Sequence, residues 1–245
     1  ISDSEIPVPK CWMRPAPEFG RHGERATAAT RGLYADHNLR TVYPVSMMIA
    51  RGFAVVSACY SEISPDWHGR KLDGCYRDDD VLSLFGFDPA RKDNPTALGA
   101  WAWALMRAMD MLESEEKIDA MRVMVAGSSR LGKAALIAGA FDERFYAVVP
   151  NQTGGGGVPL AKRDYGENVS TENRAFTHWY CTAYAKYAEA PWKTMKFDQH
   201  LFIAAIAPRA LLVQGFNERW FDTEGEYLSV KAASPVWEFL GRSGM

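Results

Sequence analysis

The sequence has 245 residues, which suits one α/β domain with enough length to bury a substantial core. Its hydrophobic content of 47% and its charged content of 24% are those of an ordinary globular protein. The net charge of -2 argues against a nucleic-acid or membrane-surface partner held by bulk electrostatics, and no apolar run is long enough to cross a bilayer.

Strands alternate with helices after a first segment, 1–45, that is rich in Pro, Arg, Gly and Ala and is expected to be mostly loop. We expect the polar stretch 63–95 to be a loop excursion outside the core, with the three aspartates at 78–80 in a solvated turn rather than a metal site. The alternation predicts a parallel sheet with right-handed crossovers. In chain order the predicted elements are a helix at 44–51, a strand at 53–60, a helix at 96–113, a strand at 122–126, a helix at 133–140, a strand at 145–149, helices at 179–189 and 200–206, and a strand at 210–215.

The junction at 127–133 carries the strongest chemical signal in the sequence. An apolar run ends at Gly127, two serines follow, and a good helix former begins at Lys133. Enzymes of the α/β-hydrolase fold present a nucleophilic serine at such a bend, which lifts the hydroxyl above the sheet. The positive end of the following helix stabilises negative charge that develops beside it. Ser129 is therefore the candidate nucleophile.

Two other interpretations of 127–133 stay open at this point. The segment also fits the first seven positions of a phosphate-binding loop, G-x-x-x-x-G-K, although Ala134 stands where that loop has Ser or Thr for magnesium. A plain strand-to-helix turn is the third interpretation. The elbow itself departs from G-x-S-x-G, because Gly132 follows Ser129 by three positions rather than two.

A serine nucleophile needs a base and an acid that orients the base. A glycine followed three positions later by a glutamate, at 215–218, makes Glu218 the leading acid, and Asp222 is the nearby alternative. In this fold the order along the chain is Ser, acid, His, and no histidine follows Glu218. We therefore expect either a non-catalytic protein or a parent protein whose histidine lies after Met245. The histidines present are His22, His37, His68, His178 and His200.

The fold class that fits these observations is an α/β-hydrolase three-layer sandwich with a mostly parallel sheet. Only one predicted strand precedes the strand at 122–126 and two follow it, so we expect 1–245 to be a single catalytic domain that lacks N-terminal strands and a last C-terminal segment. Four consecutive glycines at 154–157 can bring the backbone close to a ligand. The four cysteines have no zinc-like spacing and leave the redox compartment undecided.

Several stretches together carry a family resemblance. The junction at 127–133 reads G-x-S-R-x-G-K, including the late glycine, and 220–226 is close to W-x-D-P-x-G-E, with Thr223 in place of the proline. With these motifs the sequence resembles the glucuronoyl esterases, carbohydrate esterase family 15, which have the α/β-hydrolase fold. The resemblance favours the elbow over the phosphate-binding loop. Further matching stretches are 99–103, 142–145, 178–181, 198–200 and 207–209.

The resemblance implies a role for each of five side chains. Ser129 attacks the ester carbonyl of a glucuronic acid residue, and Arg130 stabilises the tetrahedral oxyanion through its side chain and backbone. Lys133 hydrogen-bonds sugar hydroxyls, and Glu167 grips the sugar ring. Trp220 stands at the rim of the sugar site. No metal or cofactor is implied.

The expected function is that of a serine esterase acting on esters of (4-O-methyl-)glucuronic acid, as in cross-links between lignin and glucuronoxylan. Some family members carry an acid after the strand that follows the elbow, and Gln152 stands there instead, which supports Glu218. We expect a monomer, secreted or periplasmic, a location inferred from the polymeric substrate alone. The alternatives are a non-catalytic glucuronate-binding relative without the histidine, and an esterase for other plant cell-wall esters such as acetyl or feruloyl groups.

Overall fold

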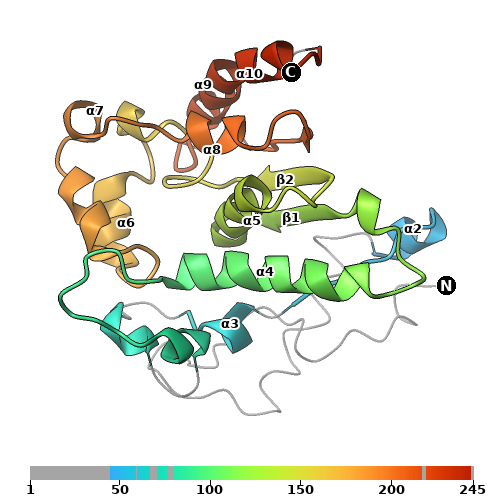
Figure 1. Ribbon diagram of the computed structural model, residues 1–245. Coiled ribbons are helices and arrows are strands. Elements are labelled where there is room, and N and C mark those ends of the chain that lie inside the picture. The colour runs from blue at the N-terminus through green and yellow to red at the C-terminus, as the bar shows by residue number, and fades with distance from the viewer. Residues whose placement is uncertain (1–44, 59, 67–70, 77–79, 217–218, 244–245) are drawn as a thin grey trace.

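The fold is built around three parallel strands that lie side by side in the order β1-β2-β3 (Figure 1). The computed structural model describes residues 45–58, 60–66, 71–76, 80–216 and 219–243. None of the helices in these ranges combines the length and the apolar character that a bilayer crossing requires. The strands are β1 (Met124–Ser128), β2 (Ala147–Asn151) and β3 (Ala210–Leu211). The helices are α2 (Val45–Ala50), α3 (Tyr60–Ile63), α4 (Ala97–Glu113), α5 (Arg130–Phe141), α6 (Val169–Ala175), α7 (Pro191–Thr194), α8 (His200–Ala204), α9 (Thr223–Ala233) and α10 (Pro235–Phe239). Short 3-10 helices are η3 (Asp73–Cys75), η4 (Val81–Phe85), η5 (Ala120–Arg122), η6 (Ala161–Arg163) and η7 (Thr182–Tyr187).

The register of the sheet brings the carboxyl ends of its strands to one edge. β1 pairs with β2 from Met124 opposite Ala147 to Ser128 opposite Asn151. An isolated bridge joins Asn151 to Gln214 beyond the end of β3. The loops that follow the three strands therefore start side by side. In open α/β sheets this edge is where ligands bind.

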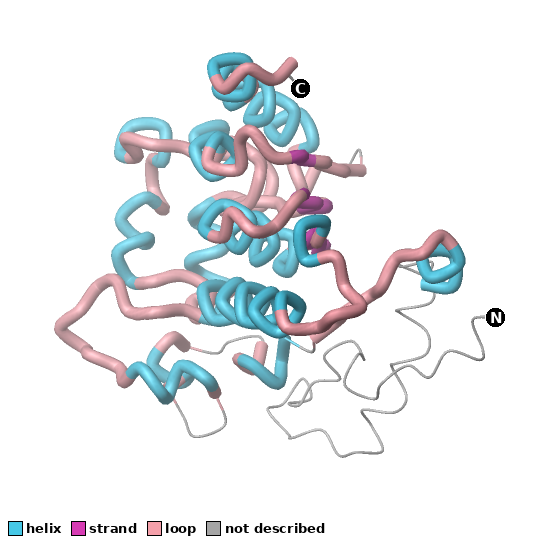
Figure 2. The backbone as a smooth tube through the Cα atoms, turned by 45° about the vertical axis from the view of Figure 1, so that its right-hand side comes forward, coloured by secondary structure: helices cyan, strands magenta, loops and turns pink. Residues whose placement is uncertain are grey.

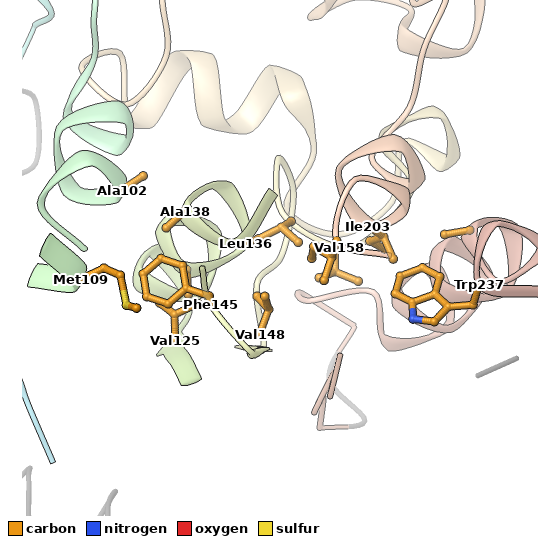
Figure 3. Packing of buried hydrophobic residues seen from close by; sticks show 13 residues of the cluster. Ala102, Met109, Val125, Leu136, Ala138, Phe145, Val148, Val158, Ile203 and Trp237 are labelled. Carbon is orange, nitrogen blue, oxygen red and sulfur yellow. The ribbon is translucent and has the colours of Figure 1, made fainter. Parts of the chain in front are cut away.

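The core lies between the sheet and the layer formed by α4, α5 and α8 on one of its faces (Figure 2). Val125 of β1, Val148 of β2 and Leu136 of α5 belong to this cluster, and Val125 lies beside Phe145 (Figure 3). Met109 of α4 lies at one end of this cluster, and Ile203 of α8 lies toward the other end, which Trp237 of α10 occupies. Each of these side chains is almost fully buried, and such burial contributes about 1.5–3 kcal/mol per side chain. The packing fixes α5, and with it the β1–α5 junction, against the sheet.

Several predicted elements are confirmed, with shifted ends. α2, α4 and α8 fall within the predicted helices at 44–51, 96–113 and 200–206. α4 begins after Thr96 because the threonine hydroxyl accepts a hydrogen bond from the Gly99 amide. β1 and β2 begin at 124 and 147 rather than at 122 and 145, and α5 begins at 130 rather than at 133.

Two predicted elements are wrong. The segment 53–58 is not a strand, because a strand requires a hydrogen-bonded ladder and this segment joins none within the described residues. The helix expected at 179–189 is reduced to η7. Trp179 and Tyr180, at its expected start, instead bond to carboxylates elsewhere in the fold. The sequence does not predict helices α3, α6, α7, α9 and α10.

The stretch 63–95 is not an excursion outside the core, which corrects a third expectation. Cys75 and Leu82 are buried against Ala100 of α4. Asp80 is also buried, and its carboxylate accepts hydrogen bonds from the Leu82 amide and the Ser64 hydroxyl. Asp80 therefore caps η4 rather than standing in a solvated turn, while positions 78 and 79 lie outside the described residues.

Candidate active site

Ser129 occupies the bend between β1 and α5 with a backbone conformation that few residues adopt. Its φ is 56° and its ψ is -128°. A positive φ is unfavourable for a residue with a β-carbon and marks the strained turn on which hydrolases of this fold place their nucleophile. The Ser129 amide donates to the Asn151 carbonyl at 2.9 Å, which ties the bend to β2. The side chain is partly exposed at the carboxyl edge of the sheet.

The late glycine of the motif has a packing reason. A β-carbon at Gly132 would lie 2.8 Å from the Asn151 carbonyl oxygen and 3.0 Å from Thr153 Cγ2. A β-carbon at Gly127 would collide with the Leu131 carbonyl. Both glycines therefore allow the first turn of α5 to lie directly on β1 and β2. The spacing from Ser129 to Gly132 fits this close contact rather than the more common elbow.

Arg130 is held in place by a buried aspartate. Arg130 Nη1 bonds to Asp66 Oδ2, and the guanidinium carbon lies 4.9 Å from the centre of the Trp179 ring. Asp66 Oδ1 is 2.7 Å from His178 Nε2 and accepts from Trp179 Nε1 at 2.9 Å. The Asp66 side chain is 2% exposed, whereas that of Arg130 is 35% exposed. The guanidinium is thus fixed on one side and open on the other.

The charges at this position reinforce one another. Burial raises the pKa of Asp66, but the hydrogen bond with His178 and the positive charge of Arg130 outweigh it and lower the pKa to about 2. Burial also lowers the pKa of Arg130, and the charge of Asp66 more than reverses that effect. Both groups are therefore ionised over the whole physiological range.

Lys133 lies one turn along α5 and is almost completely buried among carboxylates. Its Nζ is 2.9 Å from Glu167 Oε2 and 2.5 Å from Glu172 Oε1. Tyr180 donates its hydroxyl to Glu172 Oε2 at 2.5 Å. The Trp179 ring faces the ammonium group at 4.9 Å. This geometry contradicts a phosphate-binding loop, because a phosphate would meet two carboxylates around the lysine that should bind it.

The four glycines at 154–157 lie against these carboxylates. A β-carbon at Gly156 would lie 2.7 Å from Glu172 Oε2 and would collide with the Tyr180 hydroxyl. A β-carbon at Gly154 would collide with Glu167 Oε2. The glycine run therefore brings bare backbone directly over the acidic side of the Lys133 cluster.

Trp220 is connected to this cluster through the backbone. The Glu167 amide donates to the Trp220 carbonyl at 2.8 Å, and the Trp220 side chain is 48% exposed. Asp222, two residues on, caps α9 by accepting from the Gly225 amide, and it also accepts two hydrogen bonds from Arg163. Asp222 is thus already engaged as a structural group. Glu218, the leading candidate acid, lies outside the described residues.

The described histidines do not supply an evident base. His178 is fully buried and its Nε2 is engaged with Asp66. His200 begins α8, and its Nδ1 is buried without a hydrogen-bond partner. Among the described residues no hydrogen bond joins either ring to the Ser129 hydroxyl. His22, His37 and His68 lie outside the described residues.

Behind the edge of the sheet, Glu226 connects α9 to the loop after β2. Its Oε1 accepts from the Thr153 amide at 3.1 Å and from the Thr153 hydroxyl at 3.2 Å. Its Oε2 is buried without a partner, and burial raises its pKa to about 7 against the opposing effect of the Thr153 hydrogen bonds. Gln152 lies beside it with a φ of 43°, and its amide donates to the Gln214 carbonyl. This carboxylate fixes the loop that carries Gln152.

Asp66, Glu172 and Glu226 were missed by the sequence analysis. Glu226 closes the motif at 220–226, so attention to that motif could have found it. Asp66 and Glu172 belong to no motif, and only the fold brings them to Arg130 and Lys133. No group of three or more His, Cys, Asp or Glu suited to a metal ion occurs in the described part of the chain.

The sequence is similar to known proteins over most of its length. Residues 29–241 match the family described as "Glucuronyl esterase, fungi". The chain is 34% identical over 246 residues to carbohydrate esterase MZ0003 of an unknown prokaryotic organism, which covers 99% of this chain and 54% of that protein. It is 34% identical over 157 residues to the 4-O-methyl-glucuronoyl methylesterase of Hypocrea jecorina, which covers 60% of this chain and 34% of that protein.

A solved structure has a similar fold. The glucuronoyl esterase from Solibacter usitatus matches with a TM-score of 0.79 and 34% identity, over 98% of this chain and 58% of that chain. This chain spans about half the length of carbohydrate esterase MZ0003. The match confirms the α/β-hydrolase fold expected from the sequence. By sequence and by structure, the chain belongs to the glucuronoyl esterase family.

Proposed function

We propose that this chain is the part of a serine esterase that hydrolyses esters of (4-O-methyl-)glucuronic acid through an acyl-enzyme on Ser129. The observation that carries the proposal is the strained Ser129, followed directly by a cation that is anchored on one side and open on the other. The relatives named 4-O-methyl-glucuronoyl methylesterase support the choice of ester. This chain matches only part of the length of those relatives, so their activity is proposed for it here and tested below.

The acyl transfer requires charge stabilisation at the carbonyl oxygen. Attack by Ser129 Oγ on the ester carbon places a negative charge on that oxygen, while the serine proton passes to a base. The carbonyl then re-forms, the bond to the alcohol breaks, and the alcohol leaves with the proton from the base. Water attacks the resulting acyl-enzyme in the same way and releases glucuronate and free Ser129. Arg130 begins α5, so its side chain and the positive end of the helix both favour an anion beside Ser129. Asp66 keeps the guanidinium in one position, which removes the cost of ordering it during the reaction.

The uronic acid would be held by the neighbouring polar groups. Glu167 is slightly exposed, and buried Lys133 holds its carboxylate in place, where it can accept from sugar hydroxyls. The exposed indole of Trp220 offers a flat apolar face at the rim. Such a pair of groups suits a sugar that carries hydroxyls and a carboxyl ester better than an acetyl or feruloyl group.

The wider setting follows from the substrate. Esters of glucuronic acid join glucuronoxylan to lignin, so we place the protein outside the cytoplasm, secreted or periplasmic, acting as a monomer on a polysaccharide. The chemistry described needs no cofactor.

Release of methanol from methyl glucuronate tests the proposal. We expect Ser129→Ala to lower kcat by about 10⁴-fold or more, because the covalent route is lost. Ser128→Ala is the matched control and is expected to keep most of the activity, since Ser128 only ends β1. Equal activity of the two variants would refute Ser129 as the nucleophile. Faster turnover of acetylated xylan than of methyl glucuronate would favour the other plant cell-wall esters.

A second candidate is a glucuronate-binding relative without catalysis. It is favoured by the two described histidines: His178 is engaged with Asp66, and neither His178 nor His200 bonds to Ser129 within the described residues. In that case the wild-type protein and Ser129→Ala should bind methyl glucuronate equally well, and neither should release methanol. Methanol release that depends on Ser129 excludes this candidate.

The acid can be assigned by a pair of variants. If Glu218 orients the base, Glu218→Gln lowers kcat by several orders of magnitude and leaves the thermal unfolding midpoint unchanged. Asp222→Asn is instead expected to lower the midpoint, because Asp222 caps α9 and binds Arg163. Full activity of Glu218→Gln would exclude that assignment.

A further inference from the structure

Two carboxylates pair with Lys133, although one would be enough to balance its charge. Glu167 alone would balance its charge, yet Glu172 approaches more closely, with Oε1 at 2.5 Å from Nζ. The Lys133 and Glu172 side chains are 1% and 0% exposed. When both carboxylates are ionised, the cluster has one ammonium and two carboxylates and therefore carries a net negative charge. Water screens a buried charge of this kind only weakly.

The surroundings of Glu172 make its charge adjustable. Lys133 faces it from α5, Glu167 from the segment before α6, and Tyr180 and Tyr184 from the segment after α6. Burial raises the pKa of Glu172 to about 8, with Lys133 acting against burial and the charge of Glu167 acting with it. Burial raises the pKa of both tyrosines well above their usual range, so they stay neutral. Glu172 is thus the group that changes the net charge of the cluster.

The two small molecules of the proposed reaction differ in charge at this position. The substrate is a neutral ester, whereas the product is a uronate anion. We propose that Glu172 acts as a specificity-determining residue: when its carboxylate behind Lys133 is ionised, the sugar site favours the neutral ester and repels the anionic product, and when it is protonated this preference is lost. This inference rests on the proposed function, because it takes the Lys133–Glu167 pair as the place where the uronic acid binds. Glu172 itself need not touch the ligand.

The expected pH dependence has a definite sign. Below about pH 8 Glu172 binds a proton, the cluster is neutral, and glucuronate is held by Arg130 and by hydrogen bonds. Above that pH the cluster is negative and glucuronate binds more weakly. Methyl glucuronate carries no charge, so its affinity should not change over the same range. The ratio of the two dissociation constants therefore reports the charge of Glu172.

The test measures binding by calorimetry with Ser129→Ala, which cannot hydrolyse the ester through Ser129. Between pH 6 and pH 9.5 we expect Kd for glucuronate, relative to Kd for methyl glucuronate, to rise about five- to tenfold. Adding Glu172→Gln should hold that ratio constant over the range. Glu116→Gln, an exposed carboxylate in the turn after α4, removes the same charge and should leave the rise unchanged.

Tyr180→Phe gives a second route to the same answer. The Tyr180 hydroxyl bonds to Glu172 and lowers its pKa, so its loss should move the rise in the ratio to higher pH. The proposal is overturned if the ratio of the two dissociation constants does not change with pH in Ser129→Ala. It is also overturned if Glu172→Gln weakens the binding of both ligands equally at every pH. If Ser129→Ala binds neither ligand, the proposed glucuronate site itself is wrong. If both ligands bind and the ratio of their dissociation constants stays constant with pH, only the role of Glu172 is refuted and the glucuronate site is retained.

Discussion

At the scale of single residues, Asp66 shows how a buried acid can hold a cation in place and leave part of it exposed. Its two oxygens are shared among Arg130, His178 and Trp179, so its charge is spread over three donors. Arg130 keeps an exposed face because Asp66 holds it from the buried side. An oxyanion would therefore meet a cation whose position is fixed before the reaction starts.

Replacing Asp66 should affect turnover more than substrate binding. Asp66→Asn removes the charge that fixes Arg130, and we expect kcat to fall about 10- to 100-fold with little change in KM, since the oxyanion exists only after attack. Steady-state kinetics on methyl glucuronate give both constants. Asp73→Asn, on the exposed side of η3, is the control and should change neither constant. A rise in KM at constant kcat would mean that Asp66 serves substrate binding instead.

The sequence predicts site residues either by local pattern or by family resemblance, and Glu167, 34 positions from Lys133, is predicted by the resemblance alone. Ser129, Arg130 and Lys133 lie within one turn of the same junction, so local pattern and family motif suffice to place them. Asp66 reaches Arg130 across 64 positions, and Glu172 reaches Lys133 across 39. Such contacts depend on how the segment after α3 and helix α6 lie against α5, which no local pattern encodes.

At the scale of elements, the same distinction separates the confirmed predictions from the wrong ones. α4 is set by its own apolar periodicity and by the Thr96 cap, so the sequence predicts it almost to the residue. The ends of β1 and β2 are set by pairing with each other, and both were placed two residues early. The segment 53–58 has the composition of a strand, but it pairs with no strand among the described residues.

The contact between α5 and the sheet can be tested at Gly132. We expect Gly132→Ala to lower the free energy of unfolding by about 1–3 kcal/mol, because its β-carbon would lie 2.8 Å from the Asn151 carbonyl and would force α5 away from β2. Chemical denaturation measures the change. Gly99→Ala in the first turn of α4 is the matched control, since its β-carbon meets only Thr96 Oγ1 at 3.6 Å. We expect that variant to be at least as stable as wild type. Equal losses in both variants would show that Gly132 is not placed by this contact.

At the scale of the whole molecule, buried acids give the stability an uneven dependence on pH. The pKa of Asp66 is lowered to about 2, so its ionised form favours the fold, and this stability is lost only as pH falls toward 2. The pKa of Glu226 is raised to about 7 from an ordinary value of 4.5. Between these two values the unfolded chain has released a proton that the folded chain keeps, so stability falls as pH rises. Glu172 acts in the same direction.

Glu226→Gln isolates one of these contributions. The amide can still accept the hydrogen bond from the Thr153 amide, but it does not titrate, so the loss of stability between pH 5 and pH 8 should shrink by about 2–3 kcal/mol. Urea denaturation at the two pH values measures that loss. Glu224→Gln, two residues earlier and with a side chain that is 74% exposed, should leave it unchanged. If the two variants lose equal stability between pH 5 and pH 8, the proton is not held at Glu226. If only Glu226→Gln loses less stability between pH 5 and pH 8, the proton is held by the Glu226 carboxyl group, which joins α9 to the loop after β2.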